Sequence, residues 1–391
     1  MTRDMGHDWS KDCERCLKCG FVRKGFHVLN NQGECSVCHA VIPLTVGYDG
    51  SRVIEVGTLA DLQAINHQLG GHYRLIADID ASETKNWNDG KGFASIGSVH
   101  RPFAGVLDGN GHIIRNLHIN RGWEDDVGLL GVLSGSGEVR NVTLVDAKVS
   151  GNKFVGGLVG VSKGNITACQ VYGEVSGNEQ FVGGLVGSNF GSIAKCHTFG
   201  GVSGNNRFVG GLVGHNEGNI TACRASGAVS GNDRFVGGLV GVSKGDITEC
   251  HASGKVSGNE NVGGLVGHNE GNITQCHASG GALGNKLVGG LVGCNEGDIT
   301  ECHVSGEVSG NKSVGGLVGF DKATVTKSYW DIQTTGQMDS RGNGEGKTSS
   351  EMKQRAVFVG WDFENVWQIE EGQSYPTLRC FAEGGRSKVF A

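Results

Sequence analysis

The chain has 391 residues, of which 70 are glycine and 3 are proline, so glycine is more than twice as frequent as the usual figure of about 7%. Collagen is excluded, because a triple helix needs glycine at every third position and abundant proline. Disorder explains the composition poorly, because 37% of the residues are apolar. The net charge of -6, from 34 basic and 40 acidic residues, gives no general attraction to nucleic acid or to an anionic membrane.

Residues 1–50 are predicted to form a separate metal-binding module. Cys16 and Cys19, and then Cys35 and Cys38, make two C-x-x-C pairs with 15 residues between them. This is the spacing of a tetrathiolate zinc site, in which a hairpin brings the two pairs together. Few apolar residues are available for a core, so one structural Zn²⁺ would supply the folding energy, and the segment resembles a zinc ribbon.

Some details of this module stay open. Disulfides or a redox pair are the alternatives to zinc, and Cys13 with a nearby histidine leaves the fourth ligand undecided. A closed site with four protein ligands would be structural and not catalytic. Because the basic and acidic residues of the module offset one another, docking or rigid support is favoured over nucleic-acid binding.

Residues 51–126 are predicted to be an N-terminal cap and the first coils of a repeat region. Thr58 is placed to N-cap a helix in which Leu59, Leu62, Ile65 and Leu69 share roughly one face. We expect this helix to cover the first coil, because an open strand edge invites aggregation.

Residues 127–330 contain the repeat. The hexapeptide Val-Gly-Gly-Leu-Val-Gly recurs at intervals of 27 and then 26 residues, after a degenerate first copy. The copies begin at Val127, Val155, Val182, Val209, Val236, Val262, Val288 and Val314. Units this short must stack to bury an apolar face. Since they are rich in valine and turn residues and lack a helical period, we predict an all-β fold, a β-solenoid (parallel β-helix) of about eight coils of 26–28 residues with terminal caps.

Comparing the units position by position indicates which side chains point inward. Positions that accept charge in some units face water, and alternation along the strand then places the invariant cysteine inside. The predicted ladder consists of Cys169, Cys196, Cys223, Cys250, Cys276 and Cys302. We interpret it as apolar filling in preference to disulfides or a soft-metal site. The residues that follow, which include His251, His277 and His303, are predicted to lie on a solvated outer face.

Other repeated positions predict local geometry. A phenylalanine stack is expected from Phe154, Phe181, Phe208 and Phe235. The stack ends where the unit shortens by one residue, so we expect the cross-section to narrow there. A corner at Gly156-Gly157 would let both Val155 and Leu158 point inward. The turn glycines at positions 164, 191, 218, 245, 271 and 297 are expected to have positive φ.

Residues 331–391 are predicted to be a C-terminal cap. The segment from Thr348 to Glu351 fits a capping box that opens a short helix through Arg355. Apolar cover for the last coil is expected from Trp361, Phe363, Trp367 and Tyr375. With both ends covered, we expect a monomeric rod.

Several linked motifs occur in a fixed order along residues 52–380. Each unit after the degenerate first copy contains Gly-Leu-Val-Gly, most continue with Gly-Asn-Ile-Thr or a close variant, and Ser328-Tyr329-Trp330-Asp331 follows the last unit. This pattern resembles the GLUG-motif repeat family of bacterial surface proteins, whose repeats occur in adhesin-like and filamentous haemagglutinin-like chains and beside IgA-specific peptidase domains. The resemblance implies the architecture and a surface or adhesive setting, and it carries over no catalytic residue.

The predicted function is a non-enzymatic adhesive, scaffold or recognition rod that presents a rigid, repetitive surface to a glycan or protein partner. The chain is predicted not to be an enzyme, because no catalytic cluster interrupts coils 127–330. One alternative is a carbohydrate-active β-helix enzyme that uses the carboxylates of Asp78, Asp80 and Asp108. Another is an intracellular zinc-ribbon adaptor.

Two features give opposite indications about location. The family resemblance implies the cell surface or the extracellular space. The sequence, however, shows no signal peptide and no apolar run of the ~18 residues that a membrane helix needs, and reduced thiol ligands suit the cytoplasm. We therefore predict a surface location without a membrane span, with the cytoplasm as the alternative.

Overall fold

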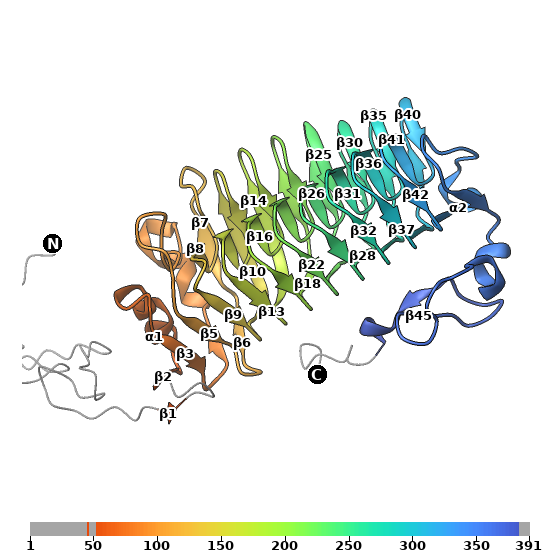
Figure 1. Ribbon diagram of the computed structural model, residues 1–391. Coiled ribbons are helices and arrows are strands. Elements are labelled where there is room, and N and C mark those ends of the chain that lie inside the picture. The colour runs from red at the N-terminus through yellow and green to blue at the C-terminus, as the bar shows by residue number, and fades with distance from the viewer. Residues whose placement is uncertain (1–44, 47–51, 383–391) are drawn as a thin grey trace, which may run out of the picture.

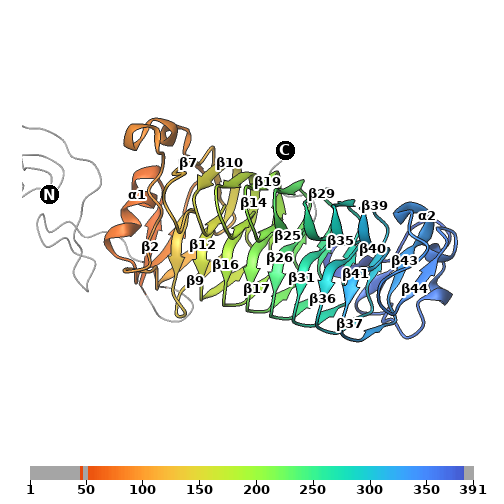
Figure 2. The same ribbon diagram turned by 90° about the horizontal axis from the view of Figure 1, so that it is seen from above.

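The computed structural model describes residues 45–46 and 52–382, which form a β-solenoid (Figure 1). The chain winds about a common axis in about eight coils, and Figure 2 shows the same stacking from above. Equivalent strands of neighbouring coils pair in parallel, as between Val186, Val213 and Val240. The all-β solenoid predicted from the repeat is confirmed.

One coil shows how the unit folds. It contains β20 (Val209–Gly210), β21 (Val213–Asn216), β22 (Ile220–Thr221), β23 (Arg224–Ala225) and β24 (Val229–Gly231). The strands are short because glycine- and asparagine-rich turns separate them. Each coil therefore contributes one step of about 4.8 Å to several parallel sheets at once.

One of these sheets, called sheet A here, has eight strands that lie side by side along the solenoid. It consists of β8 (Leu130–Leu133), β12 (Val159–Ser162), β16 (Val186–Asn189), β21 (Val213–Asn216), β26 (Val240–Ser243), β31 (Val266–Asn269), β36 (Val292–Asn295) and β41 (Val318–Asp321). The third residues of these strands form one row, called the third-position row, whose side chains reach the surface to differing extents. Because the register is unbroken, residues about 26 positions apart become neighbours in this row.

The core consists of repeated apolar rows. Val209, Leu212, Ile220 and Cys223 of one coil are all fully buried, as are their equivalents in neighbouring coils. Burying an aliphatic side chain of this size contributes roughly 1.5–3 kcal/mol, so each coil stabilises the stack. All six ladder cysteines are fully buried, which confirms the predicted inward row.

The predicted corner after the first hexapeptide valine is present. β11 (Val155–Gly156) ends at Gly156, and β12, in sheet A, begins at Val159. Val155 and Leu158, three residues apart, are both fully buried because the chain changes direction between them. A Cβ on Gly156 would meet backbone carbonyl oxygens at 2.2 and 2.7 Å, so the glycine permits close backbone approach.

The turn glycines have a different role from the one predicted. None of the six has a positive φ, and a Cβ on Gly218 would lie 1.7 Å from the carbonyl oxygen of Gly191 in the neighbouring coil. The prediction was wrong because these glycines allow close stacking of turns. Positive φ occurs instead at residues such as Phe208 (φ 66) and Glu249 (φ 51). Backbone hydrogen bonds to the next coil hold these strained residues in place.

The change from 27 to 26 residues per unit is confined to one loop. Three residues separate Ser230 from Arg234, whereas two separate their paired partners Ser257 and Glu260 in the next unit. Val262 and Leu265 beyond this loop remain fully buried. The apolar rows thus continue past the point where we expected a narrower cross-section.

The N-terminal helix is confirmed. α1 (Leu59–Ala64) begins after Thr58, whose side chain accepts a hydrogen bond from the backbone of Asp61 while the Asp61 carboxylate accepts one from the backbone of Thr58. Leu62 and Ile65 are fully buried against the first coil. Within the described residues, no helix has both the length and the apolar character needed to cross a membrane.

The C-terminal residues cover the side of the solenoid. β44 (Glu345–Lys347) pairs with β43 (Tyr329–Asp331) at the last coil, and the chain then turns back. Residues 351–382, called the side cap here, include the antiparallel strands β45 (Trp367–Gln368) and β46 (Thr377–Leu378) and lie beneath the later coils in Figure 1. Its aromatic residues contact the last coil, where Trp361 donates to the Lys327 carbonyl at 3.0 Å and Tyr375 to Asp331 at 2.6 Å. They also extend along the side of the solenoid to earlier coils, where Trp367 packs on His277 at 5.9 Å.

The start of the side cap also differs from the predicted helix. Thr348 and Glu351 form the expected reciprocal capping bonds, with the Thr348 backbone donating to Glu351 at 2.8 Å. Two 3₁₀ turns, Glu351–Lys353 and Arg355–Val357, follow in place of one continuous helix.

Candidate functional site

The predicted zinc ligands Cys16, Cys19, Cys35 and Cys38 lie outside the described residues. Zinc binding by residues 1–50 therefore stays a prediction. The other candidate residues from the sequence fall into four groups, which the structure places at different points of the solenoid.

The cysteine ladder is a structural element. The Cys223 sulfur accepts a hydrogen bond from the backbone of Cys196 at 3.4 Å and donates to the carbonyl of Thr221 at 3.3 Å. Ser328 continues the ladder beyond Cys302, where its hydroxyl accepts from the Cys302 backbone at 3.1 Å. Burial raises the pKa of the Cys223 thiol, which disfavours reactivity. The ladder thus fills the core.

The histidine row is buried, contrary to the prediction of a solvated face. His251, His277 and His303 stack on one another with ring centroids 3.8 and 4.9 Å apart. The side cap covers them: Trp367 packs on His303 at 5.6 Å, and the His303 Nε2 donates to the Pro376 carbonyl at 2.9 Å. The prediction failed because an alternating pattern of polar side chains along a strand gives no information about a distant segment that packs over them.

The carboxylates of the first coils are occupied by local hydrogen bonds. Asp80 accepts bonds from Asn116 and Ser82, which lower its pKa. Asp108 pairs with Arg140 at 3.0 Å, and although burial opposes the shift, hydrogen bonds from Asn141 and Arg140 lower its pKa. Carboxylates held ionised in this way are poor general acids, so these residues serve as turn and capping elements.

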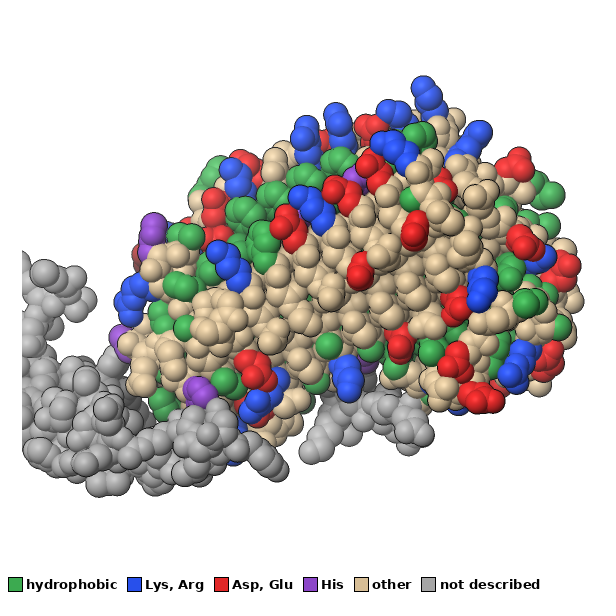
Figure 3. Space-filling view, viewed as in Figure 1, with side chains coloured by type: hydrophobic (Ala, Val, Ile, Leu, Met, Phe, Trp, Pro, Cys, Tyr) green, Lys and Arg blue, Asp and Glu red, His purple; other side chains and the backbone are tan. Residues whose placement is uncertain are grey.

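The phenylalanine stack lies at the surface beside sheet A. Adjacent rings of Phe154, Phe181, Phe208 and Phe235 have centroids 4.8, 4.8 and 5.2 Å apart and interplanar angles of 3–4°. All four side chains are half-buried. In Figure 3 hydrophobic side chains gather on the upper part of the visible face, toward the N-terminal half of the solenoid. The predicted stack is therefore present and forms a partly exposed apolar stripe.

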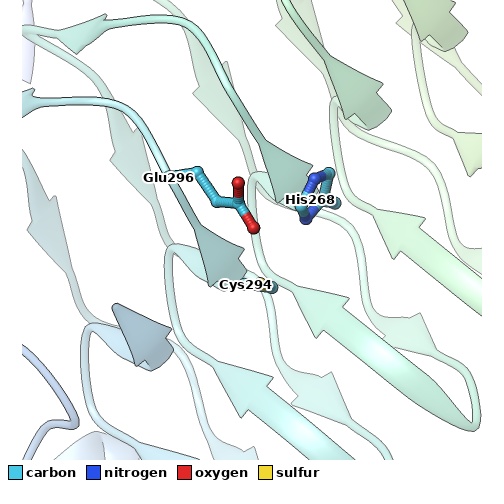
Figure 4. Close-up of side chains that lie close together, drawn as sticks. All are labelled: His268, Cys294 and Glu296. Carbon is cyan, nitrogen blue, oxygen red and sulfur yellow. The ribbon is translucent and has the colours of Figure 1, made fainter. Parts of the chain in front are cut away.

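The third-position row carries a cluster that the sequence analysis missed. In register order the row reads Val132, Val161, Ser188, His215, Val242, His268, Cys294 and Phe320. His268 on β31 faces Cys294 on β36, and Glu296 follows two residues later (Figure 4). One potential ligand atom from each of these three residues lies within 4.8 Å of the other two.

Neighbouring groups set the charge of this cluster. The Glu296 carboxylate accepts a hydrogen bond from Lys322 at 2.7 Å, which lowers its pKa, while burial raises the pKa of the Cys294 thiol to about 11. The His268 Nε2 lies 3.4 Å from the Glu270 carboxylate, and its Nδ1 is buried without a hydrogen-bond partner among the described residues. The cluster thus combines a carboxylate, a protonated thiol and a free imidazole nitrogen.

One signal in the sequence pointed toward this cluster. Cys294 belongs neither to the N-terminal pairs nor to the ladder. Aligning the units shows that it occupies a position filled by valine, serine, histidine or phenylalanine elsewhere, which marks it as the one cysteine in this row.

Comparisons with known proteins support the repeat assignment. The model of the GLUG motif matches residues 205–230, 258–282 and 284–309. Halomucin of Haloquadratum walsbyi is 44% identical over 135 residues, which are 32% of this chain and 2% of that protein. A protein of Evansella cellulosilytica, provisionally named a Gly-rich membrane protein, is 34% identical over 116 residues, 28% of this chain and 13% of its own. The chain therefore spans a small part of either relative.

Two solved structures are similar in fold. A Bacteroides ovatus protein provisionally named an immunoglobulin A1 protease has a TM-score of 0.48 at 20% identity, with 85% of this chain and 94% of its own covered. A chain named IgA1 Protease has a TM-score of 0.47 at 18% identity, with 84% and 25% covered.

These names contradict the prediction that the chain is not an enzyme, and that prediction is corrected here. At such identities the likeness concerns the fold, and it carries no protease activity over to this chain. The conclusion from sequence, structure and comparisons together is that the chain is a parallel β-solenoid built on GLUG motif repeats.

Proposed function

We propose that this protein is a recognition or adhesive rod whose phenylalanine stack contacts an extended glycan or protein partner at a cell surface. The observation that carries the proposal is the placement of four phenylalanines in consecutive coils at a strained backbone position. Their φ values of 53–66° fall in the left-handed region, which Asn and Gly occupy at lower cost.

The later coils show which residues the position accepts. Asn261, Leu287 and Ser313 occupy it with φ of 54–55°, so the fold itself does not require an aromatic ring. In the first half the rings gain mutual stacking worth about 0.5–1.5 kcal/mol per pair, which offsets the strain and leaves an apolar stripe partly exposed. Such a stripe, repeated at one coil spacing, can add many weak contacts along an extended partner.

The surroundings of the stack fit a contact surface. Phe190, with 44% of its surface exposed, and His215 lie beside it, with ring centroids 6.1 Å apart. The His215 ring packs edge-on against Phe181 at 5.6 Å. An aromatic group of this kind, with an exposed margin, is typical of recognition surfaces. The two curated relatives, a halomucin and a Gly-rich membrane protein by name, support a setting at the cell surface.

The test compares binding to a glycan array and to a panel of surface proteins. We expect the double change Phe181→Asn and Phe208→Asn to weaken binding by about 10- to 100-fold, because two aromatic contacts are lost. Asn is the residue of the equivalent position at 261, so the fold should be retained.

Phe199→Ser is the matched control. Phe199 is an exposed aromatic residue on another sheet, and Ser226 is its counterpart in the next coil. Equal binding by the double variant and the unchanged protein, or a loss seen only with Phe199→Ser, would contradict the proposal.

A further inference from the structure

We propose that His268, Cys294 and Glu296 bind a divalent transition-metal ion of the zinc class at the surface of sheet A. Imidazole, thiolate and carboxylate are the ligands that suit Zn²⁺ and its neighbours, whereas Mg²⁺ and Ca²⁺ prefer oxygen alone. Three protein ligands leave a fourth position for water or for a group from a partner. The site is separate from the predicted N-terminal zinc module and does not depend on the proposed recognition role.

The fold fixes two of the three ligands. His268 and Cys294 are direct partners in the parallel pairing of β31 and β36, so their side chains leave neighbouring strands about 4.8 Å apart. Glu296 follows β36, and 37% of its side chain is exposed, so it can turn toward the pair by giving up its surface bond to Lys322. Zinc bonds of about 2.0–2.3 Å require ligand atoms roughly 3.5 Å apart, so small rotations from the present separation of up to 4.8 Å close the site.

The histidine is already oriented for coordination. Its Nε2 faces the Glu270 carboxylate at 3.4 Å, and its Nδ1 is buried with no hydrogen-bond partner in residues 45–46 and 52–382. A metal-bound histidine characteristically donates its second N–H to a carboxylate, which fixes the ring and its tautomer. The edge-on ring of Phe235, 5.6 Å away, holds the imidazole from another side. The unpaired Nδ1 is therefore the nitrogen that we assign to the metal.

The charges around the cluster favour a cation. Charged residues follow the strands of sheet A, and in two places residues of opposite charge in adjacent units pair there. These pairs are Glu217 with Lys244 and Glu296 with Lys322. Glu270 and Glu296 lie next to each other in this series, because they follow the paired strands β31 and β36. Like charges opposite each other in a sheet are destabilising. Lys322 already pairs with Glu296, and His268 lies beside Glu270, so a divalent ion between these units would add positive charge next to two adjacent carboxylates.

Cys294 would bind a metal ion as the thiolate, so the ion must displace the thiol proton. Burial raises the pKa of this thiol to about 11. The same raised pKa, and the lack of a hydrogen bond between this thiol and His268 in the described structure, disfavour a Cys–His nucleophile at this position.

The experiment titrates the full chain with Co²⁺ in the presence of a non-thiol reductant. The variants are Cys294→Val and His268→Val, since Val242 fills the same row one unit earlier and shows that the fold accepts valine. We expect each variant to bind about one equivalent less Co²⁺ than the unchanged protein, with loss of the corresponding thiolate–cobalt absorption. Any binding by the N-terminal cysteines is common to all samples and cancels in the comparison.

Two further measurements make the result specific. Zn²⁺ should protect Cys294 from iodoacetamide, as read by mass spectrometry of its peptide. Glu270→Gln should weaken binding at this site by about 10- to 100-fold without lowering the unfolding midpoint. His215→Val is the matched control, because His215 lies in the same row beside Glu217 but has no cysteine partner. Equal Co²⁺ stoichiometry in Cys294→Val and the unchanged protein, with alkylation of Cys294 unaffected by Zn²⁺, would overturn the proposal.

Discussion

Lowering the pH should release the side cap from the solenoid. The three histidines beneath it are held neutral: burial, with the charge of Arg224 and His303, lowers the pKa of His251 to about 3, and burial lowers that of His303 to about 4 despite its bond to Pro376. The pKa of the fully buried His277 is lowered as well, by burial and by its histidine neighbours. In the released state the same side chains would lie on an open sheet and titrate near 6.5.

The loss of docking free energy follows from the difference in histidine pKa between the docked and the released state. The released state binds the protons, so docking of the side cap is at full strength above pH 6.5 and weakens as the pH falls from 6.5 toward 4. For His303 the change from 6.5 to about 4 corresponds to about 3 kcal/mol of lost docking free energy. If the three histidines titrate together, the summed loss of docking free energy would exceed the free energy that holds most local elements in place.

The assay follows the side cap between about pH 7.5 and 4.5, a range in which histidine is the side chain expected to titrate. Trp361 and Trp367 pack on His303 at 6.1 and 5.6 Å, so tryptophan fluorescence and limited proteolysis both report on docking. His303→Gln should make release less steep with pH, because Gln170 fills this row in an earlier coil and does not titrate. His112→Gln, in the first coils, serves as the control. Equal protection of the side cap at both ends of the range would refute the reasoning.

Two other changes probe the remaining parts of the chain. Gly218→Ala should destabilise the solenoid by about 3 kcal/mol or more, because its methyl group would overlap the Gly191 carbonyl. Gly201→Ala is the control: a Cβ at Gly201 would meet no described atom within 4 Å, so the thermal midpoint should be nearly unchanged. A similar loss in both variants would show that lost glycine flexibility, and not the clash, matters. Cys16→Ser should abolish about one equivalent of N-terminal zinc and unfold residues 1–50 without shifting the solenoid midpoint. Metal content and circular dichroism would show whether that segment folds without zinc.

The repeat made the core predictable but not the strain in the backbone. Alternation along each strand required Cys223 to point inward once its neighbours were seen to accept charge, and the structure confirms this. Positive φ at Glu249 and Phe208 could not be predicted, because single residues of these types avoid it. Hydrogen bonds to the next coil stabilise these conformations, and such bonds exist only after the coils have stacked.

Contacts between distant segments limited the prediction of the site. Trp367 was recognised as apolar cover, but its position over His303 depends on the return of the chain along the solenoid. His268 and Cys294 are 26 residues apart, and they meet only because the coil length equals that separation. The repeat period is therefore enough to find such pairs, provided that the residues breaking the consensus are examined row by row.

The side cap restricts how this rod can change its length. It contacts successive coils from that of His197, which packs against Phe381 at 5.7 Å, to that of His303, which bonds to Pro376. Duplication of a unit before Val182 would lengthen the rod by about 4.8 Å and leave these contacts in register. Duplication of a unit between His197 and His303 would move these two residues one coil further apart. The side cap could then not keep both the contact of Phe381 with His197 and the bond of Pro376 to His303. Growth of the molecule by gain of units is therefore compatible with its C-terminal attachment only at the N-terminal side.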